Sequence, residues 1–255
     1  MIQPQGKEGD RNAMETMLIR ERYKVVRVIA RQSDYALLEA VDISDRETPS
    51  CLLNLYEGKL LRRYARICSG IRKEECPAFR GMFLERGTLV AVFSQSSGEP
   101  IDTQFRRGDS WSIDDRLLYT EKLLHCALSL ANMPSEMSCA ALLSDNVLID
   151  PKEHRVSIRW MLMPMEEMNQ RETALLATDQ VRKIMPKTLR AGKEEWRFLN
   201  ELESGLFRYV VSLYSRWREA EPAIREERTA FQRKSFVRRG LIMLGHVFRR
   251  KRKED

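Results

Sequence analysis

The sequence lacks the features that mark membrane, secreted and metal-binding proteins. It contains no run of about 20 apolar residues, the length that a membrane-spanning helix needs. Residues 1–8 hold no apolar stretch of the kind found in signal peptides. The five cysteines form no C-x-x-C pair, and the three histidines lie far apart along the chain. We therefore expect a cytoplasmic protein with reduced thiols, no metal site and no cofactor.

The composition is that of a folded protein with an uneven distribution of charge. Of the 255 residues, 43% are hydrophobic and 32% are charged, which is enough apolar content for a core. The net charge is +7, and residues 225–255 alone hold 11 Lys and Arg against 4 Asp and Glu. The rest of the chain is therefore neutral, and the basic excess does not indicate a nucleic-acid-binding body.

Residues 16–100 carry a pattern of strands interrupted by one helix, after a polar segment, 1–15, that we expect to be disordered. Apolar or β-branched runs bounded by turns predict five strands, at 23–29, 35–41, 51–56, 79–84 and 88–93. Apolar residues at helical spacing predict a helix over 58–72. Gly98 and Pro100 mark a hinge after the last strand. The order is β-β-β-α-β-β, and the short connections predict an antiparallel sheet.

The region 101–222 is predicted to be mainly helical. Ser112 is an N-cap candidate, with Asp115 three residues later, for a long helix that ends near Ala131. A short hairpin is predicted in the 140s and 150s. Two more helices are predicted over 172–186 and 193–217, the second with an apolar side that includes Trp196 and Trp217.

The segment 144–161 carries the most informative motif. Residues 144–150 read Ser-Asp-Asn-Val-Leu-Ile-Asp, and a second apolar strand at 156–158 leads to Arg159, Trp160 and Met161. With the order of strands and helix, this segment resembles the catalytic loop and the following metal-binding segment of protein kinases. The resemblance covers about residues 18–163. It implies an α+β, bilobal kinase-like fold: a five-stranded antiparallel N-lobe sheet with one helix over 16–100, and a shortened, mainly helical C-lobe over 101–222.

The positions that carry kinase chemistry are changed in this sequence. Aligning Asn146 with the magnesium-binding asparagine of the family locates the phosphate-loop glycines, the ATP-binding lysine, the catalytic aspartate and the metal-binding aspartate. The residues found there are, in the same order, Ala30, Gln32 and Tyr35; Asn54; Ala141; and Arg159. Because four independent parts are lost, the resemblance implies a pseudokinase without catalytic residues or cofactor. Asn146, the one remnant of a cofactor site, is expected to bond to the loop backbone, and Trp160 to pack between the lobes.

The C-terminal segment 223–255 predicts a basic amphipathic helix and tail. An apolar face runs through 230–248 with basic residues on both sides. The candidates for binding an anionic membrane surface or an acidic partner are Arg238, Arg239, Arg249, Arg250, Lys251, Arg252 and Lys253. A final helix that packs on its own domain is the alternative. Nucleic acid is not expected as a partner, because no aromatic platform accompanies the charges.

Three functions stay open. The first is a pseudokinase scaffold that binds an unidentified protein partner, in the cytoplasm or peripheral at the inner face of the cell membrane. The chain is also similar to the cytosolic pseudokinase part of type VII secretion subunits of Gram-positive bacteria, although 240–248 is too short for the transmembrane helix of that family. The second is a divergent ATP-dependent phosphotransferase of kinase fold with relocated residues, Lys59, Asp145, Asn146 and Asp150. The third is an unrelated α+β interaction domain.

Overall fold

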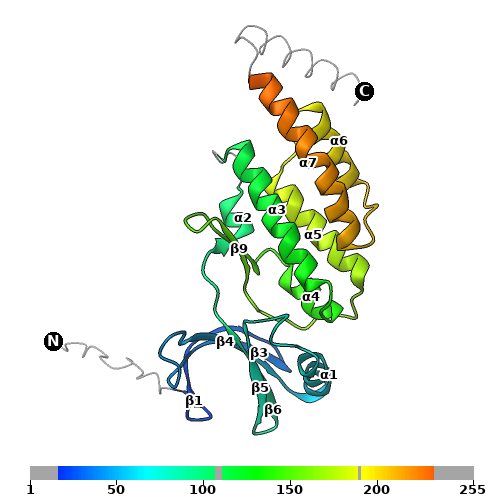
Figure 1. Cartoon of the computed structure of the whole chain (residues 1–255). Coiled ribbons are helices and arrows are strands. Elements are labelled where there is room, and N and C mark those ends of the chain that lie inside the picture. The colour runs from blue at the N-terminus through cyan, green and yellow to red at the C-terminus, as the bar shows by residue number, and fades with distance from the viewer. Residues whose placement is uncertain (1–16, 107–110, 189–190, 233–255) are drawn as a thin grey trace, which may run out of the picture.

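The computed structural model describes residues 17–106, 111–188 and 191–232. Figure 1 shows two parts: a curled antiparallel sheet with one helix, here called the sheet part, and a group of helices with a small second sheet, called the helical part. The predicted disordered segment, 1–15, and the seven basic candidates between 238 and 253 lie outside the described residues.

The sheet part has six strands, one more than predicted. In the order of the sheet they are β1 (Leu18–Ile19), β2 (Tyr23–Arg31), β3 (Tyr35–Asp42), β4 (Ser50–Tyr56), β6 (Thr88–Ser94) and β5 (Phe79–Glu85). Every pair of neighbours is antiparallel. The helix α1 (Gly58–Ser69) follows β4, as the helical spacing predicted.

The additional strand is β1, which is too short for a sequence pattern to reveal. Leu18 pairs with Lys24 and Ile19 with Tyr23, so β1 and β2 form a tight hairpin. The turn between them holds Arg20 and Glu21 at φ 53°, a left-handed conformation that side chains other than glycine rarely adopt. β1 is therefore one edge strand of the sheet, and β5 is the other.

Two apolar cores lie on the two faces of this sheet. The smaller one lies in the curl of the sheet and includes Tyr23, Leu53 and Val92. The larger one begins at α1 and the other face of the sheet and continues without a break into the helical part. Because one buried cluster spans both parts, we expect them to unfold together.

The helical part contains six helices and a three-stranded sheet within the described ranges. In chain order its elements are β7 (Glu99–Pro100), α2 (Ile101–Gln104), α3 (Ile113–Leu130), α4 (Ser135–Ala141), β8 (Val147–Asp150), β9 (Arg155–Ile158), α5 (Gln170–Ile184), α6 (Lys193–Glu203) and α7 (Val210–Gln232). The N-cap prediction for α3 is confirmed, because the Ser112 and Asp115 side chains form a reciprocal capping box. None of these helices has the length and apolar content needed to cross a bilayer.

The single helix predicted over 193–217 is wrong: the structure has two helices there, α6 and α7. Gly205 lies between them at φ +64°, a conformation that glycine takes at little cost and that ends helices. Leu206, which lies between the two helices, is 73% exposed. The apolar spacing continues across the break, so periodicity alone could not reveal it.

The helix α7 extends beyond Pro222, where a separate tail was expected to begin. Ile224 is fully buried, and the Glu227 carboxylate accepts hydrogen bonds from the backbone N–H groups of Lys193 (2.7 Å) and Glu194 (3.0 Å). These N–H groups lie in the first turn of α6, which has no N-cap side chain of its own. Residues 223–232 therefore pack on the helical part rather than forming a free basic helix.

Replacing Gly192 with alanine is expected to destabilise the protein by about 1 kcal/mol, the usual effect of losing an N-terminal cap. A Cβ at Gly192 would lie 2.2 Å from Glu227 Oε2, so the carboxylate would have to leave the α6 N-terminus. The measurement is urea unfolding. The matched control is Gly70→Ala, where the nearest atom is 3.6 Å from the added Cβ. Equal stability of the two variants would contradict the cap.

Candidate functional site

The structure brings three of the predicted site residues together between the sheet part and the helical part. These residues, all buried, are Tyr35 on β3, Asn54 on β4 and Asn146 before β8. Asn54 and Asn146 bond to the segment 159–162, and Tyr35 bonds to Asn54. Gln32 lies apart from them, exposed in the turn between β2 and β3. Ala141, at the end of α4, is completely buried in the apolar core.

Asn54 binds the segment 159–162 directly to the sheet. Its Nδ2 donates to the Trp160 carbonyl (3.0 Å), and its Oδ1 accepts from the Leu162 backbone N–H (2.8 Å). The Tyr35 hydroxyl also donates to this Oδ1 (3.1 Å). Asn54 has no exposed surface, so each bond forms where water does not compete. Asn54, which the sequence alignment placed at the lysine position of kinases, is therefore a crosslink between two parts of the chain.

Tyr56 adds a second crosslink that the sequence reasoning missed. Its hydroxyl donates to the Leu162 carbonyl (2.8 Å), so Leu162 is held through both its N–H and its C=O. Asn54 and Tyr56 are two residues apart on β4 and therefore point to the same face of the sheet. Burial raises the pKa values of Tyr35 and Tyr56, and both stay neutral hydrogen-bond donors.

Trp160 fills the space beside these bonds with its ring. It is 5% exposed and stacks on Phe93 of β6, with ring centroids 5.5 Å apart and an interplanar angle of 18°. The sequence predicted that Trp160 packs between the two parts, and the stack confirms it. Phe93 also contacts Phe79 of β5 (5.1 Å), so the aromatic contacts extend to the edge strand of the sheet.

Asn146 is bonded to the loop backbone, as expected. Its Nδ2 donates to the backbone carbonyls of Ala140 (2.7 Å) and Met161 (2.9 Å). The backbone carbonyl of Asn146 accepts from the Arg159 N–H (2.7 Å). Its Oδ1 has no hydrogen-bond partner among the described residues. A single amide oxygen is a poor site for Mg²⁺, which ordinarily needs at least one carboxylate.

The surroundings of Asn146 do not supply that carboxylate. Arg159 stands where the metal-binding aspartate was expected, and a guanidinium there repels a divalent cation. Asp145 is exposed. Asp150 accepts from the backbone N–H groups of Lys152 (3.1 Å) and Glu153 (3.2 Å) in the turn after β8, and these bonds lower its pKa. The described residues include no group of three His, Cys, Asp or Glu that could hold a metal, and the residues present do not fit a metal-bound triphosphate.

Comparison with known proteins identifies the fold. No family model and no curated protein sequence matches the chain. The solved kinase domain of PknI from Mycobacterium tuberculosis superposes with a TM-score of 0.53 at 13% identity, covering 84% of this chain and all of that domain. A single-substitution variant of the same domain gives a TM-score of 0.54 at 12% identity, with 84% and 99% covered.

The fold is that of a protein kinase domain. The kinase-like fold that the resemblance implied is thereby confirmed. The corrections are the sixth strand, β1, and the division of the last predicted helix. At 12–13% identity the likeness shows the fold alone, so function has to be argued from the residues of this chain.

Proposed function

We propose that this protein is a catalytically inactive, kinase-like binding module, a pseudokinase. The observation that carries the proposal is the bonding of Leu162 to Asn54 and Tyr56. In a kinase, the strand that carries Asn54 supplies a lysine for the phosphates, and the segment that contains Arg159 supplies a carboxylate for the metal. Here the two elements bond to each other, and their side chains are an amide and a guanidinium.

The chemistry of these residues supports the same conclusion. Phosphoryl transfer in this fold depends on positioning and on stabilising negative charge with metal ions and a lysine. Asn54 carries no charge, and its donor and acceptor are both used within the protein. The alternative, a divergent phosphotransferase, would need Lys59 as the replacement cation. Lys59 is exposed on the first turn of α1 and forms no ion pair with a described residue.

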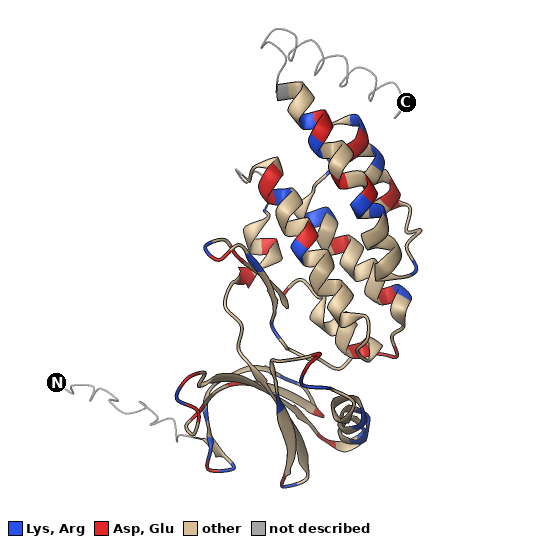
Figure 2. Ribbon diagram, viewed as in Figure 1, with Lys and Arg blue, Asp and Glu red and all other residues tan. Residues whose placement is uncertain are grey.

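A protein partner is supported by the outer face of α1. Lys59, Arg62 and Arg66 recur there at helical spacing, all exposed, and α1 contains no acidic residue. Figure 2 shows basic residues along this helix at the margin of the sheet part. None of these three side chains forms an ion pair with a described residue, so the face favours an acidic partner. Binding of a membrane or an acidic partner by the basic residues between 238 and 253, peripheral localisation and a role in bacterial secretion remain proposals.

Thermal unfolding with ATP and Mg²⁺ or Mn²⁺ separates the two candidate functions. A ligand that binds only the folded state at about 100 times its Kd stabilises it by about 2.7 kcal/mol. We expect no change in Tm at millimolar nucleotide, with an active kinase domain measured in parallel to show that the assay responds. A saturable rise in Tm that needs both nucleotide and metal would contradict the pseudokinase proposal and favour the phosphotransferase.

A further inference from the structure

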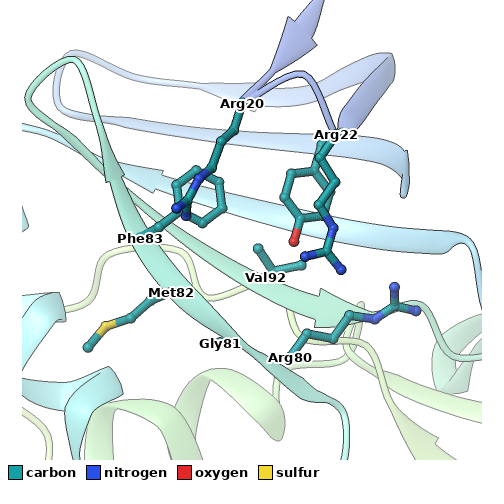
Figure 3. Close-up of a pocket in the computed structure, with 8 residues that line it drawn as sticks. Arg20, Arg22, Arg80, Gly81, Met82, Phe83 and Val92 are labelled. Carbon is teal, nitrogen blue, oxygen red and sulfur yellow. The ribbon is translucent and has the colours of Figure 1, made fainter. Parts of the chain in front are cut away.

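A pocket lined by three arginines lies on the sheet part, in the curl of the sheet and away from Asn54. It has a volume of about 350 Å³ and lies where β1 and β2 approach β5 (Figure 3). This volume is within the range of small-ligand sites, which is about 300–1,000 Å³. The lining includes Arg20, Arg22 and Arg80, with Tyr23 and Phe83 as aromatic walls.

A series of stacked groups holds two of the guanidinium groups at this pocket. Arg20 lies over the Phe83 ring, 4.9 Å from its centroid, and Arg22 lies 5.2 Å from the Tyr23 centroid. The two rings stack with centroids 5.7 Å apart and an interplanar angle of 8°. Stacking uses the faces of the guanidinium groups and leaves N–H donors at their edges. Arg20 forms no ion pair with a carboxylate of the described residues, so its charge is available to a ligand.

Arg22 and Arg80 are also fixed by bonds within the protein. Arg22 donates through Nε (2.9 Å) and Nη2 (2.7 Å) to the buried Asp42 carboxylate, which leaves Nη1 without a bond to it. Arg80 donates to Ser94 Oγ (2.9 Å) and lies 3.3 Å from the Asp45 carboxylate. Arg22 and Arg80 thus lie at the Asp42 and Asp45 carboxylates, and the positive charge of Arg20 is not compensated by a carboxylate of the described residues. The Arg22 hydrogen bonds lower the pKa of Asp42 to about 2, so this arrangement persists at neutral pH.

The β5 edge of the pocket offers backbone groups as well as charge. Among the described residues, β5 is the last strand of the sheet and pairs only with β6. Gly81 lines the pocket on this strand, and a Cβ built there would meet no atom within 4 Å. An extended peptide can pair with a free strand edge of this kind, and a cluster of arginines is the usual way to recognise a phosphorylated side chain.

We propose that the three-arginine pocket binds a phosphate monoester on a segment of a partner protein, which lies along the β5 edge. Arg20 and Arg22 donate to the phosphate oxygens, Tyr23 and Phe83 contact the side chain that carries the phosphate, and β5 pairs with the peptide backbone. The proposal goes beyond the inactive kinase site and does not depend on it, because the pocket shares no residue with that site.

The test is a two-dimensional ¹⁵N NMR titration of the full chain with three probes. These are the amide Ala-Ala-phosphotyrosine-Ala-Ala, its unphosphorylated form and inorganic phosphate. We expect saturable shifts at Gly81 and Phe83 with the phosphopeptide, and no saturation with the unphosphorylated peptide. Inorganic phosphate should bind about tenfold more weakly than the phosphopeptide, because it lacks the aromatic and backbone contacts.

Arg20→Ala should weaken phosphopeptide binding about tenfold, the usual effect of losing a charged hydrogen bond. The matched control is Arg27→Ala, which removes the same charge from an exposed arginine paired with Glu39 outside the pocket. It should change binding less than about twofold. Absence of saturable binding at millimolar phosphopeptide, or equal weakening of binding by both variants, would contradict the proposal that this pocket binds the phosphate. If inorganic phosphate bound as tightly as the phosphopeptide, the proposal that the phosphate belongs to a partner segment would be wrong.

Discussion

Replacing Asn54 with leucine is expected to destabilise the protein by about 3–5 kcal/mol, because it leaves buried polar groups without partners. Leucine has the same branching and the same number of side-chain heavy atoms as asparagine, so the variant removes the hydrogen bonds without opening a cavity. The Trp160 carbonyl, the Leu162 N–H and the Tyr35 hydroxyl would each lose a partner. Urea unfolding measures the change.

Two further substitutions test this interpretation of Asn54. Tyr35→Phe removes one of the three bonds and leaves Asn54 bound to the segment 159–162, so it should cost about 1 kcal/mol. Asn54→Lys restores the residue type of active kinases, but it buries an ammonium group at a position whose described bonding partners include no carboxylate. It should therefore destabilise the protein at least as much as Asn54→Leu does. A stable Asn54→Lys variant that gains nucleotide binding would show that Asn54 is only a degenerate remnant.

Replacing Trp160 with alanine is expected to cost about 3–5 kcal/mol, the usual range for removing a buried tryptophan. The ring stacks on Phe93 and lies where the apolar core passes from the sheet part to the helical part. Its loss should leave a cavity between the two parts. We therefore also expect the single unfolding transition to broaden or to split in two.

Trp160→Phe is the matched control, because it keeps an aromatic ring against Phe93. It should cost about 1.5 kcal/mol or less and keep one transition. If alanine and phenylalanine had the same small effect, the Trp160 ring would not be part of the contact between the two parts.

Much of the sheet part could be predicted from the sequence. Its strands either alternate apolar and polar residues or consist mainly of buried apolar residues, and clear turns separate them. The five longer strands and α1 lie close to their predicted positions. β1 was not predicted because two residues cannot establish an alternating pattern, and because its hairpin depends on unusual φ values at Arg20 and Glu21. The break between α6 and α7 escaped because the apolar spacing continues through Gly205.

The site was only half visible in the sequence. Motif spacing predicted that Asn54 and Arg159 depart from kinase chemistry, but it could not reveal which groups Asn54 bonds to. Its partners are a backbone carbonyl and a backbone N–H more than 100 residues away, and backbone groups carry no sequence signal. Tyr56 had a weak signal, since it shares a strand face with Asn54. The three-arginine pocket had none, because Arg20, Arg22 and Arg80 meet only through the curl of the sheet.

We propose that the segment 159–162 is a fixed crosslink between the two parts of the molecule rather than a site for nucleotide and metal. Hydrogen exchange of the Leu162 amide tests it most directly, because this N–H donates to the buried Asn54 side chain. We predict that this amide exchanges only through global unfolding, and that ATP with Mg²⁺ leaves its rate unchanged. Exchange through a low-energy local opening, or a rate that nucleotide and metal alter together, would contradict the account.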